Sequence, residues 1–320
     1  MKLFLAPMEG VIDHHMRAIL TRIGGYQQCV TEFIRVIDRP LPIHVFKRIC
    51  PELEQDCITA SGTPVTIQLL GGLAQAMAEN AQQAVALGAR SIDINFGCPS
   101  RFVNRKAGGA VLLQEPQRLF EITSAVRKAV PTEIPVSAKI RLGYESTELA
   151  LENALAVEAA NADFITVHAR TKVDGYKHPA RWEWLGHINA TLNIPVVANG
   201  DINSLEDLRR CREVSACNQF MLGRGALRQP DLARQIMHTE TGKPIEAMQW
   251  SEVKILLLEM ITKMQTDSSC KPIQVLGRLK QWLVFLKQHY PQAAQIFIQL
   301  RLLKQLPQAE ALLQQQAKAA

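Results

Sequence analysis

Short runs of apolar residues alternate with longer amphipathic segments along the first two thirds of the chain. Each run is bounded by polar or turn-forming residues, which is typical of a buried β-strand. The starts of the runs lie about 25 to 45 residues apart, the repeat expected when strands alternate with helices in a (β/α)8 barrel. The eight runs cover residues 3–6, 29–33, 65–69, 91–95, 136–140, 164–168, 196–199 and 219–222.

The segments between these runs carry helix signals. Pro116 precedes an i, i+3, i+4, i+7 stripe that starts at Leu119, so it suits a first helical turn. Gly88 is expected to end a helix over residues 74–87. An open, doubly wound sheet would also alternate strands and helices. However, eight units with polar residues at nearly every strand end favour the closed α/β TIM barrel.

From about Ser251 the strand-like runs end and four amphipathic segments follow, separated by breaks that contain proline. These segments cover residues 252–265, 273–289, 292–304 and 308–319. We therefore expect a barrel over residues 1–240, a linker over 241–250 and an all-α helical domain over 251–320. A bundle of this size needs to pack against the barrel or a partner for stability. Trp282 and Phe285 are expected to be core residues, as aromatics at helical spacing usually are.

The composition is that of an ordinary folded protein, with 47% hydrophobic and 21% charged residues among 320. No apolar run approaches the roughly 18 to 20 residues of a membrane span. The apolar start is also shorter than the segment of about 7–15 residues in a signal peptide. We therefore expect a cytoplasmic protein that does not enter a membrane. The net charge of +6 and the pI of about 9.0 suit a polyanionic partner without requiring one.

The seven cysteines predict neither a disulfide framework nor a metal site. Their number is odd and no CxxC pair occurs. The pairs Cys50/Cys57 and Cys211/Cys217 have no second pair at the spacing of zinc ligands. We expect no bound metal, and the sequence indicates no obligate protein partner.

Polar residues end nearly every predicted strand, and a parallel barrel brings all of its strand ends to one face. The glycines of Asn199-Gly200-Asp201 and Gly223-Arg224-Gly225 follow the last two strands. Such glycines let backbone N–H groups approach a phosphate, and Arg224 can add charge-assisted hydrogen bonds. The other strand-end candidates are Pro7, Met8, Glu9, Glu32, Arg35, Gln68, Asn95, Cys98, Lys139, Arg141, His168 and Arg170.

The stretch from Ser91 to Leu113 joins a predicted strand to a thiol and a cationic loop. Cys98 lies between Gly97 and Pro99 at the strand end, outside any apolar run. That position favours a functional thiol over a buried structural one. A thiol is mostly protonated at neutral pH, so it can donate a proton as well as attack.

Lys139 is compatible with two chemistries. A buried lysine on a barrel strand can form a Schiff base, as in an aldolase. It can also stabilise the negative charge of a reduced flavin. Gln68 and the phosphate loops favour the flavin.

The motif Asn95-x-Gly97-Cys98-Pro99-Ser100, with Gly108-Gly109 downstream, resembles the signature of the tRNA-dihydrouridine synthases. These are flavin enzymes that reduce uridine in tRNA. Similar matches extend over most of the barrel, including residues 6–10, 139–143 and 168–171. The resemblance implies a TIM barrel that binds FMN, NADPH as the reductant, and a helical tail that helps to grip tRNA. The residues implied to hold FMN are Pro7, Met8, Gln68, Lys139, His168, Asn199, Gly200, Asp201, Gly223 and Arg224, and we add Glu9.

On this resemblance Cys98 is the proton donor, with hydride delivered to C6 of uracil and the proton to C5. Hydride delivery leaves an enolate, which requires hydrogen-bond donors and an acid. The candidate substrate residues are Asn95, Arg141, Arg35 and Arg170. The candidate tRNA contacts are Arg101, Arg105, Lys106, Arg278, Lys280 and Lys287.

Residues 32–36, 49–53 and 280–283 are most similar to the bacterial C-type branch of this family, which modifies uridine 16 in the D-loop of tRNA. Two departures from the family pattern are Phe96, at a variable position, and Ala169, where glycine is common. Both are conservative and leave the implied reaction in place.

The residues alone leave other functions open. One is a flavin oxidoreductase resembling the dihydroorotate dehydrogenases, which would act on a free pyrimidine. A lysine aldolase is another, and a bound flavin would exclude it. A purely RNA-binding role leaves Cys98, Lys139 and the phosphate loops without a function. No GxGxxG fingerprint indicates where NADPH docks.

Overall fold

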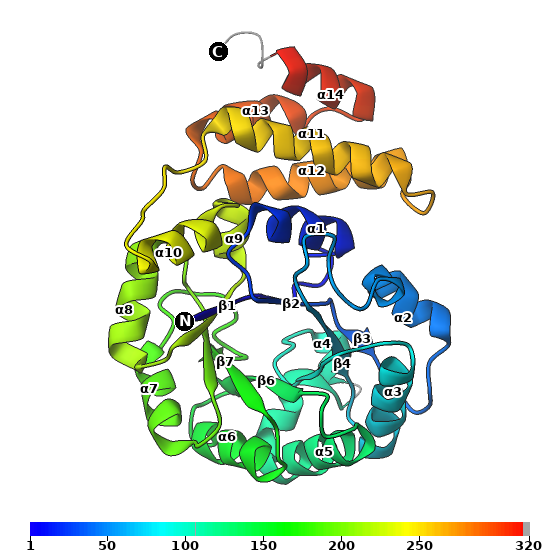
Figure 1. The fold of residues 1–320 in the computed structure, drawn as a ribbon, viewed down its shortest axis with the longest axis vertical. Helices are drawn as coiled ribbons and strands as arrows, with labels where there is room; N and C mark the ends of the chain where they lie inside the picture. Colours follow the sequence, from blue (N-terminus) through cyan, green and yellow to red (C-terminus); the bar gives the residue numbers. More distant parts are fainter. Residues whose placement is uncertain (106, 316–320) are drawn as a thin grey trace.

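Parallel strands form a closed barrel in the computed structural model, which describes residues 1–105 and 107–315 (Figure 1). The strands are β1 (Lys2–Leu5), β2 (Gln28–Val30), β3 (Ile34–Arg35), β4 (Val65–Leu70), β5 (Ile92–Asn95), β6 (Val136–Gly143), β7 (Phe164–Thr171), β8 (Val196–Asn199) and β9 (Gln219–Leu222). Strand β1 pairs with β9, and the pairing continues through β8, β7, β6 and β5 to β4. Strand β2 closes the barrel by pairing with both β1 and β4. The predicted TIM barrel is confirmed.

The helices surround the barrel and continue into a tail (Figure 1). They are α1 (His14–Ile23), α2 (Ile43–Ile49), α3 (Ala74–Ala86), α4 (Arg101–Asn104), α5 (Pro116–Ala129), α6 (Ala150–Ala159), α7 (Trp182–Thr191), α8 (Leu205–Ser215), α9 (Arg224–Arg228), α10 (Leu232–Glu240), α11 (Trp250–Thr266), α12 (Pro272–Leu286), α13 (Pro291–Leu300) and α14 (Leu306–Gln315). Short 3₁₀ helices cover Pro51–Glu54 and Gly109–Gln114. The helix signals at Pro116 and Gly88 are confirmed, since α5 begins at Pro116 and α3 ends just before Gly88.

The second predicted strand, residues 29–33, is two strands in the structure. Cys29 in β2 pairs with Val65, and Ile34 in β3 pairs with Leu69, so both strands use the long strand β4. Thr31 still donates its N–H to the Thr66 carbonyl, but the regular ladder then breaks before Ile34. The break falls at Thr31 and Glu32, two polar residues that we interpreted as the end of a single strand.

The strands are buried on both faces, as expected for a parallel barrel. Leu3 and Leu5 of β1 belong to the large core between the barrel and its helices. Phe4 and Ala6, at the alternate positions, pack in a small cluster with Val30, Val197 and Met221. The apolar runs were therefore continuous because both sides of each strand are covered.

The tail helices α11 to α14 lie together at one side of the barrel, next to α1 and α9 (Figure 1). The Trp282 indole donates to the Leu227 carbonyl of α9 at 3.1 Å, so α12 is joined to the barrel by a buried hydrogen bond. The prediction of Trp282 as a core residue is confirmed. Phe285 is different, because it is half-buried and faces the pocket described below. Pro307, expected to separate helices, is the second residue of α14, where proline is tolerated.

The part of the predicted last helix beyond residue 315 lies outside the described residues. Within the described residues, no helix is both long and apolar enough to cross a membrane. All seven cysteines lie in the described part and are free thiols.

Candidate active site

A cavity of about 540 Å³ opens at the carboxyl ends of the barrel strands. The strand register sets its walls, because Asn95 lies beside Lys139, and His168 lies between Arg141 and Asn199. All of the predicted flavin-binding residues line this cavity, together with the predicted proton donor and two of the predicted substrate residues. They are Pro7, Met8, Glu9, Gln68, Asn95, Cys98, Lys139, Arg141, His168, Asn199, Gly200, Asp201, Gly223 and Arg224.

The Lys139 side chain is half-buried in the wall of this cavity. Its Nζ donates to Asn199 Oδ1 at 3.0 Å, and Asn199 Nδ2 donates to the Met221 carbonyl at 2.8 Å. Burial, reinforced by the neighbouring Arg141, lowers the pKa of Lys139 to about 8. A half-buried ammonium held by a neutral amide favours an anion or an electron-rich carbonyl close to it.

The His168 imidazole is surrounded by positively charged side chains. Burial, and then the charges of Arg141, Lys139, Arg170 and Arg224, hold its pKa well below the ordinary value. His168 is therefore neutral at physiological pH. The surrounding cations make this end of the cavity suitable for an anionic ligand such as a phosphate.

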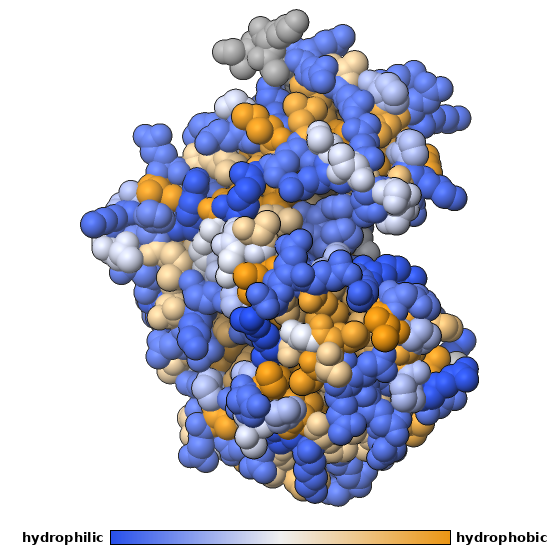
Figure 2. Space-filling view, turned by 45° about the vertical axis from the view of Figure 1, so that its right-hand side comes forward, coloured by the Kyte–Doolittle hydropathy of each residue, from blue (hydrophilic) through white to orange (hydrophobic). Residues whose placement is uncertain are grey.

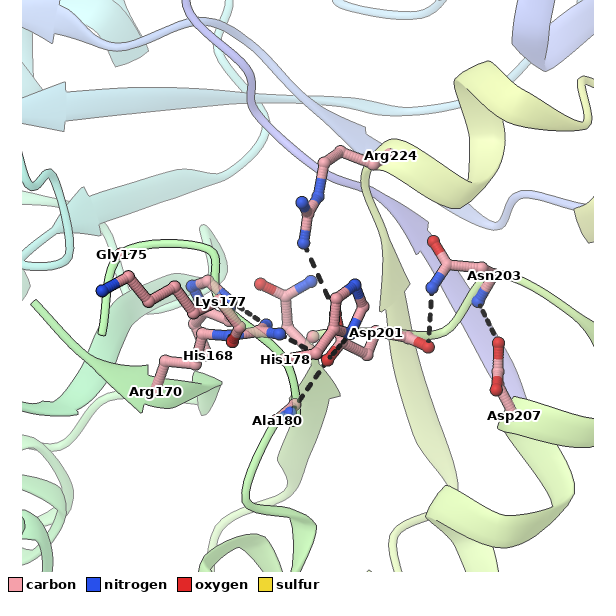
Figure 3. Close-up of polar contacts among 12 residues, drawn as sticks. His168, Arg170, Gly175, Lys177, His178, Ala180, Asp201, Asn203, Asp207 and Arg224 are labelled. Carbon is pink, nitrogen blue, oxygen red and sulfur yellow. Dashed lines mark hydrogen bonds and ion pairs between the residues drawn. The ribbon is translucent and has the colours of Figure 1, made fainter. Parts of the chain in front are cut away.

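Asp201 is the centre of a network of polar contacts that fixes two of these cations, Arg170 and Arg224 (Figure 3). Arg170 forms an ion pair with its Oδ2, and His178 Nδ1 lies 2.8 Å from the same oxygen. The Ala180 N–H also donates to Oδ2 at 2.8 Å, while Arg224 Nη2 lies 3.4 Å from Oδ1. Asp201 has a left-handed backbone conformation, with φ of 55°, directly after Gly200. The carboxylate thus holds Arg224 at the cavity wall.

A chain of buried polar side chains runs from the cavity into the barrel. Asn95 Nδ2 donates to Gln68 Oε1 at 2.8 Å, and Gln68 Nε2 donates to Asp93 Oδ2 at 2.7 Å. Ser137 Oγ donates to the other Asp93 oxygen at 2.6 Å. Burial raises the pKa of Asp93 to about 6. These hydrogen bonds fix the orientation of the Asn95 and Gln68 amides, and so determine which of their atoms can contact a ligand. We did not predict Asp93 or Ser137, although Asp93 stands two residues before Asn95 and shares its face of the strand.

Cys98 is held by its loop with the thiol at the cavity wall. Its carbonyl accepts from Ala110 N–H at 3.0 Å and from Asn104 Nδ2 at 3.1 Å. Gly109 makes this close approach possible, because it has φ of +69° and a Cβ there would lie 2.9 Å from the Cys98 carbonyl oxygen. Burial raises the pKa of the Cys98 thiol, so the thiol keeps its proton at neutral pH.

Arg141 connects the Cys98 loop to the loop after β7. Its Nε donates to the Gly97 carbonyl at 2.8 Å, and its Nη1 donates to the Gly175 carbonyl at 2.9 Å. Its guanidinium also lies 5.4 Å from the ring centroid of Tyr176, and the Arg224 guanidinium lies 5.1 Å from the same ring. Tyr176 lines the cavity and is half exposed, so it presents an aromatic face to a ligand. We did not predict Tyr176, because it lies in a loop beyond the strand end.

Two predicted substrate residues do not line the cavity. Arg170 is fully buried and pairs with Asp201, so it supports the wall from behind. The Arg35 guanidinium lies 4.2 Å from the ring centroid of Phe102, beside the loop that carries Cys98. Arg101 and Arg105 of this loop are exposed. Lys106 lies outside the described residues.

The predicted tRNA contacts of the tail differ in whether other groups of the protein already bind their cationic side chains. Arg278 donates to the carbonyls of Gly10 and Val11 and lies 3.0 Å from Asp13, so it joins α12 to the barrel. Lys280 donates to the carbonyls of Arg301 and Leu303. Lys287 is exposed, with its Nζ 4.5 Å from the Phe297 ring centroid.

Known proteins are similar in sequence to this chain over most of its length. The family described as Dihydrouridine synthase (Dus) matches residues 4–319. The chain is 48% identical to the tRNA-dihydrouridine(16) synthase of Aquipseudomonas alcaligenes over 301 residues, which cover 94% of this chain and 95% of the relative. It is 48% identical to the protein of the same name from Shewanella oneidensis over 304 residues, covering 95% and 94%. The Neisseria meningitidis serogroup B protein of that name is 45% identical over 303 residues, covering 95% and 91%.

Solved structures support the fold. The 2-naphthoyl-CoA reductase complex with 2-naphthoyl-CoA superposes with a TM-score of 0.57 at 15% identity, covering 76% of this chain and 50% of that one. A variant of NCR from Zymomonas mobilis gives a TM-score of 0.52 at 14% identity, covering 78% and 89%. At such low identity these likenesses concern the barrel fold alone.

Proposed function

The chain belongs to the dihydrouridine synthase family, whose reaction is flavin-dependent reduction of uridine in tRNA, and on this premise we propose its position, cofactors and site residues. The proposed reaction converts uridine 16 in the D-loop to 5,6-dihydrouridine, with FMN as the flavin and NADPH as the reductant. The relatives named above carry position 16 in their names. Family membership also decides against the free-pyrimidine oxidoreductase, the aldolase and the purely RNA-binding protein.

One observation carries the assignment of the site: a half-buried lysine with a lowered pKa and a protonated thiol line the same cavity. Lys139 would face the flavin ring edge that carries charge, with Gln68 and Asn199 as its polar neighbours. Arg224 and the backbone at Gly223 would hold the phosphate. The residues present therefore fit FMN, which needs one anion site and polar contacts to its ring.

When bound, the flavin supplies the hydride for C6 of the uracil. The protein supplies the rest of the chemistry. Cys98 holds the proton for C5, because its raised pKa keeps the thiol protonated until it is needed. Asn95, fixed by Gln68 and by the Gly97 N–H, presents an amide to the base. The positive field of Lys139 and Arg141 stabilises negative charge that develops on the pyrimidine oxygen.

The target base must leave its stack to enter such a cavity, because the reacting carbons are not accessible inside folded RNA. Figure 2 shows an indentation between the barrel and the tail, bordered in large part by hydrophilic residues. Among the predicted contacts, the exposed cations Arg101, Arg105 and Lys287 suit phosphate binding best. Selection of the D-loop would then depend on the shape of the tRNA and on phosphate positions.

We propose the cytoplasm as the location, since the substrate is tRNA. We also retain the proposed division into a barrel over residues 1–240, a linker over 241–250 and a tRNA-binding tail over 251–320. Residues 241–249 form no helix or strand between α10 and α11, which supports a linker there.

The direct test uses tRNA that lacks dihydrouridine. Incubation with the flavin-loaded protein and NADPH is expected to add two hydrogens at one position, 16, as mapped by mass spectrometry of nuclease fragments. Reduction at another D-loop position would contradict the position, and reduction of free uridine at an equal rate would contradict tRNA as the recognised substrate.

We predict that the affinity for tRNA falls steeply with salt. Each phosphate contact contributes a slope of about −0.7 to −0.9 in a plot of log K against log salt concentration. Arg105→Gln is expected to reduce this slope by about one contact, whereas Arg39→Gln, an exposed arginine beyond β3 whose near partner is the adjacent Asp38, is expected to leave it unchanged. Binding titrations at several salt concentrations measure both slopes. A flat salt response in the unmodified protein would remove the basic surface from the proposal.

A further inference from the structure

Three side chains with metal-binding atoms, those of His14, His15 and Asp267, meet where the tail contacts the barrel, and Cys270 lies beside His15. His14 and His15 are the first two residues of α1, while Asp267 and Cys270 lie in the turn between α11 and α12. Asp267 Oδ2 lies 3.5 Å from His14 Nε2 and 3.1 Å from His15 Nε2. Cys270 Sγ lies 3.8 Å from His15 Nε2. Two parts of the chain that are 252 residues apart thus bring their donor atoms to one point.

These separations match the edges of a tetrahedral zinc site. Zinc lies about 2.0–2.2 Å from imidazole nitrogen and carboxylate oxygen, so tetrahedral ligands of this kind lie about 3.3–3.4 Å apart. A thiolate lies at about 2.3 Å, which lengthens a sulfur–nitrogen edge to about 3.6 Å. The three measured distances of 3.1, 3.5 and 3.8 Å differ from these values by only a few tenths of an ångström. His14, His15 and Asp267 therefore need little movement to enclose an ion, and Cys270 would have to turn further toward the group to complete the tetrahedron.

The surroundings of the group also suit a cation. The two imidazole rings lie 3.9 Å apart between centroids, a separation at which two protonated rings would repel. The side chains of His15, Asp267 and His14 are 10, 23 and 29% exposed, so the group is shielded but open to an ion from solvent.

We propose that His14, His15, Asp267 and Cys270 bind one zinc ion that fastens the α11–α12 turn to the start of α1. None of the four residues lines the active-site cavity, so the site is structural and separate from the uridine chemistry. Cys270 would lose its proton when zinc binds, because the thiolate is the ligand. The tail carries Phe285 to the cavity, so zinc would hold that wall in place. We expected no metal from the cysteine spacing alone, which could not reveal ligands from two distant segments.

The test uses the full-length, flavin-loaded protein after treatment with a chelator. Titration with zinc is expected to reach one ion per chain by calorimetry and elemental analysis. Cobalt in its place is expected to give the intense long-wavelength bands of tetrahedral cobalt, together with a thiolate charge-transfer band. At a hundredfold excess of free zinc over Kd, the unfolding temperature is expected to rise by about 5 °C.

Matched variants identify the ligands. Cys270→Ser and His15→Ala are each expected to weaken zinc binding by at least about 100-fold, since loss of a direct ligand exceeds the 10–100-fold effect of a ligand's supporting partner. Cys270→Ser is also expected to abolish the thiolate band. His44→Ala, at an exposed histidine, and Cys98→Ala, at the cavity thiol, are expected to bind zinc as the unmodified protein does.

The proposal is overturned if the unmodified protein binds no stoichiometric zinc, or if Cys270→Ser binds it equally well. In the first case the cluster is a hydrogen-bonded contact between His15 and Asp267 without an ion. In the second case zinc binds through other residues, and the proposed set of four ligands is wrong. Because neither measurement uses tRNA or NADPH, the outcome is independent of the proposed uridine reduction.

Discussion

Cys98→Ala is expected to lower the rate of dihydrouridine formation by about 10²–10⁴-fold, the usual contribution of a positioned general acid. Reduction of the bound flavin by NADPH should stay at its normal rate, since the thiol is proposed to act only on the tRNA base. Rapid-mixing absorbance measurements separate the two half-reactions. Loss of the thiol would remove the proposed proton source for C5, while the proposed flavin site is formed by other residues of the cavity.

The pH dependence gives a second check on Cys98. An acid whose pKa is raised stays protonated at neutral pH and loses its proton only as pH rises beyond the ordinary thiol value. Turnover on tRNA should therefore be constant around neutrality and fall in the alkaline range, and Cys98→Ala should lose this fall. Cys211→Ala, at a buried thiol of α8 away from the cavity, is the control and should turn over normally. Full activity of Cys98→Ala on tRNA would refute the role of proton donor.

Asp201→Ala is expected to lower the free energy of unfolding by about 3–5 kcal/mol, the usual effect of removing one partner of a buried ion pair. The change leaves Arg170, whose side chain is fully buried, without its anion, and it frees Arg224 and the Ala180 N–H. Chemical denaturation monitored by circular dichroism measures the loss. The variant should also be purified with less flavin, because Arg224 is no longer held at the cavity wall.

Two further variants test whether the unpaired Arg170 causes this loss. The double variant Asp201→Ala, Arg170→Met removes the buried charge as well and should recover part of the stability, but not the flavin. Glu206→Ala removes an exposed partner of Arg209 at 3.9 Å and should leave the denaturation midpoint unchanged. Equal stability of Asp201→Ala and the unmodified protein would show that Arg170 finds another anion or solvent.

The barrel and the residues around its cavity could be predicted from sequence because both follow from local patterns. A parallel strand buried on both faces is a continuous apolar run, and its polar end marks the face where ligands bind. Lys139, His168 and Asn199 were found in this way; the register pairs His168 with Asn199, and Lys139 donates to the Asn199 side chain. The break between β2 and β3 was missed, because the polar Thr31 and Glu32 were interpreted as the end of one strand, whereas Ile34 pairs again with β4 beyond them.

The roles of individual charges could not be read from sequence. Arg170 was grouped with the substrate residues because it ends a predicted strand, and Arg278 with the tRNA contacts because it is a cation of the predicted helical tail. In the structure Arg170 is paired with Asp201, and Arg278 is paired with Asp13 and two backbone carbonyls. These partners lie up to 268 residues away along the chain, so only the tertiary fold brings them together. Asp93 was missed for the related reason that a buried acid in an apolar strand gives no local sign of its partner Gln68.

Phe285 reaches the candidate active-site cavity from α12, although the other residues that line this cavity come from the barrel. On the proposed function, a chimera that carries the tail of a relative with a different target uridine would therefore exchange part of this cavity along with the proposed tRNA-binding surface. Engineering of a new target position therefore cannot exchange the barrel and the tail independently. The side chain at position 285 would have to be chosen anew to pack against each barrel.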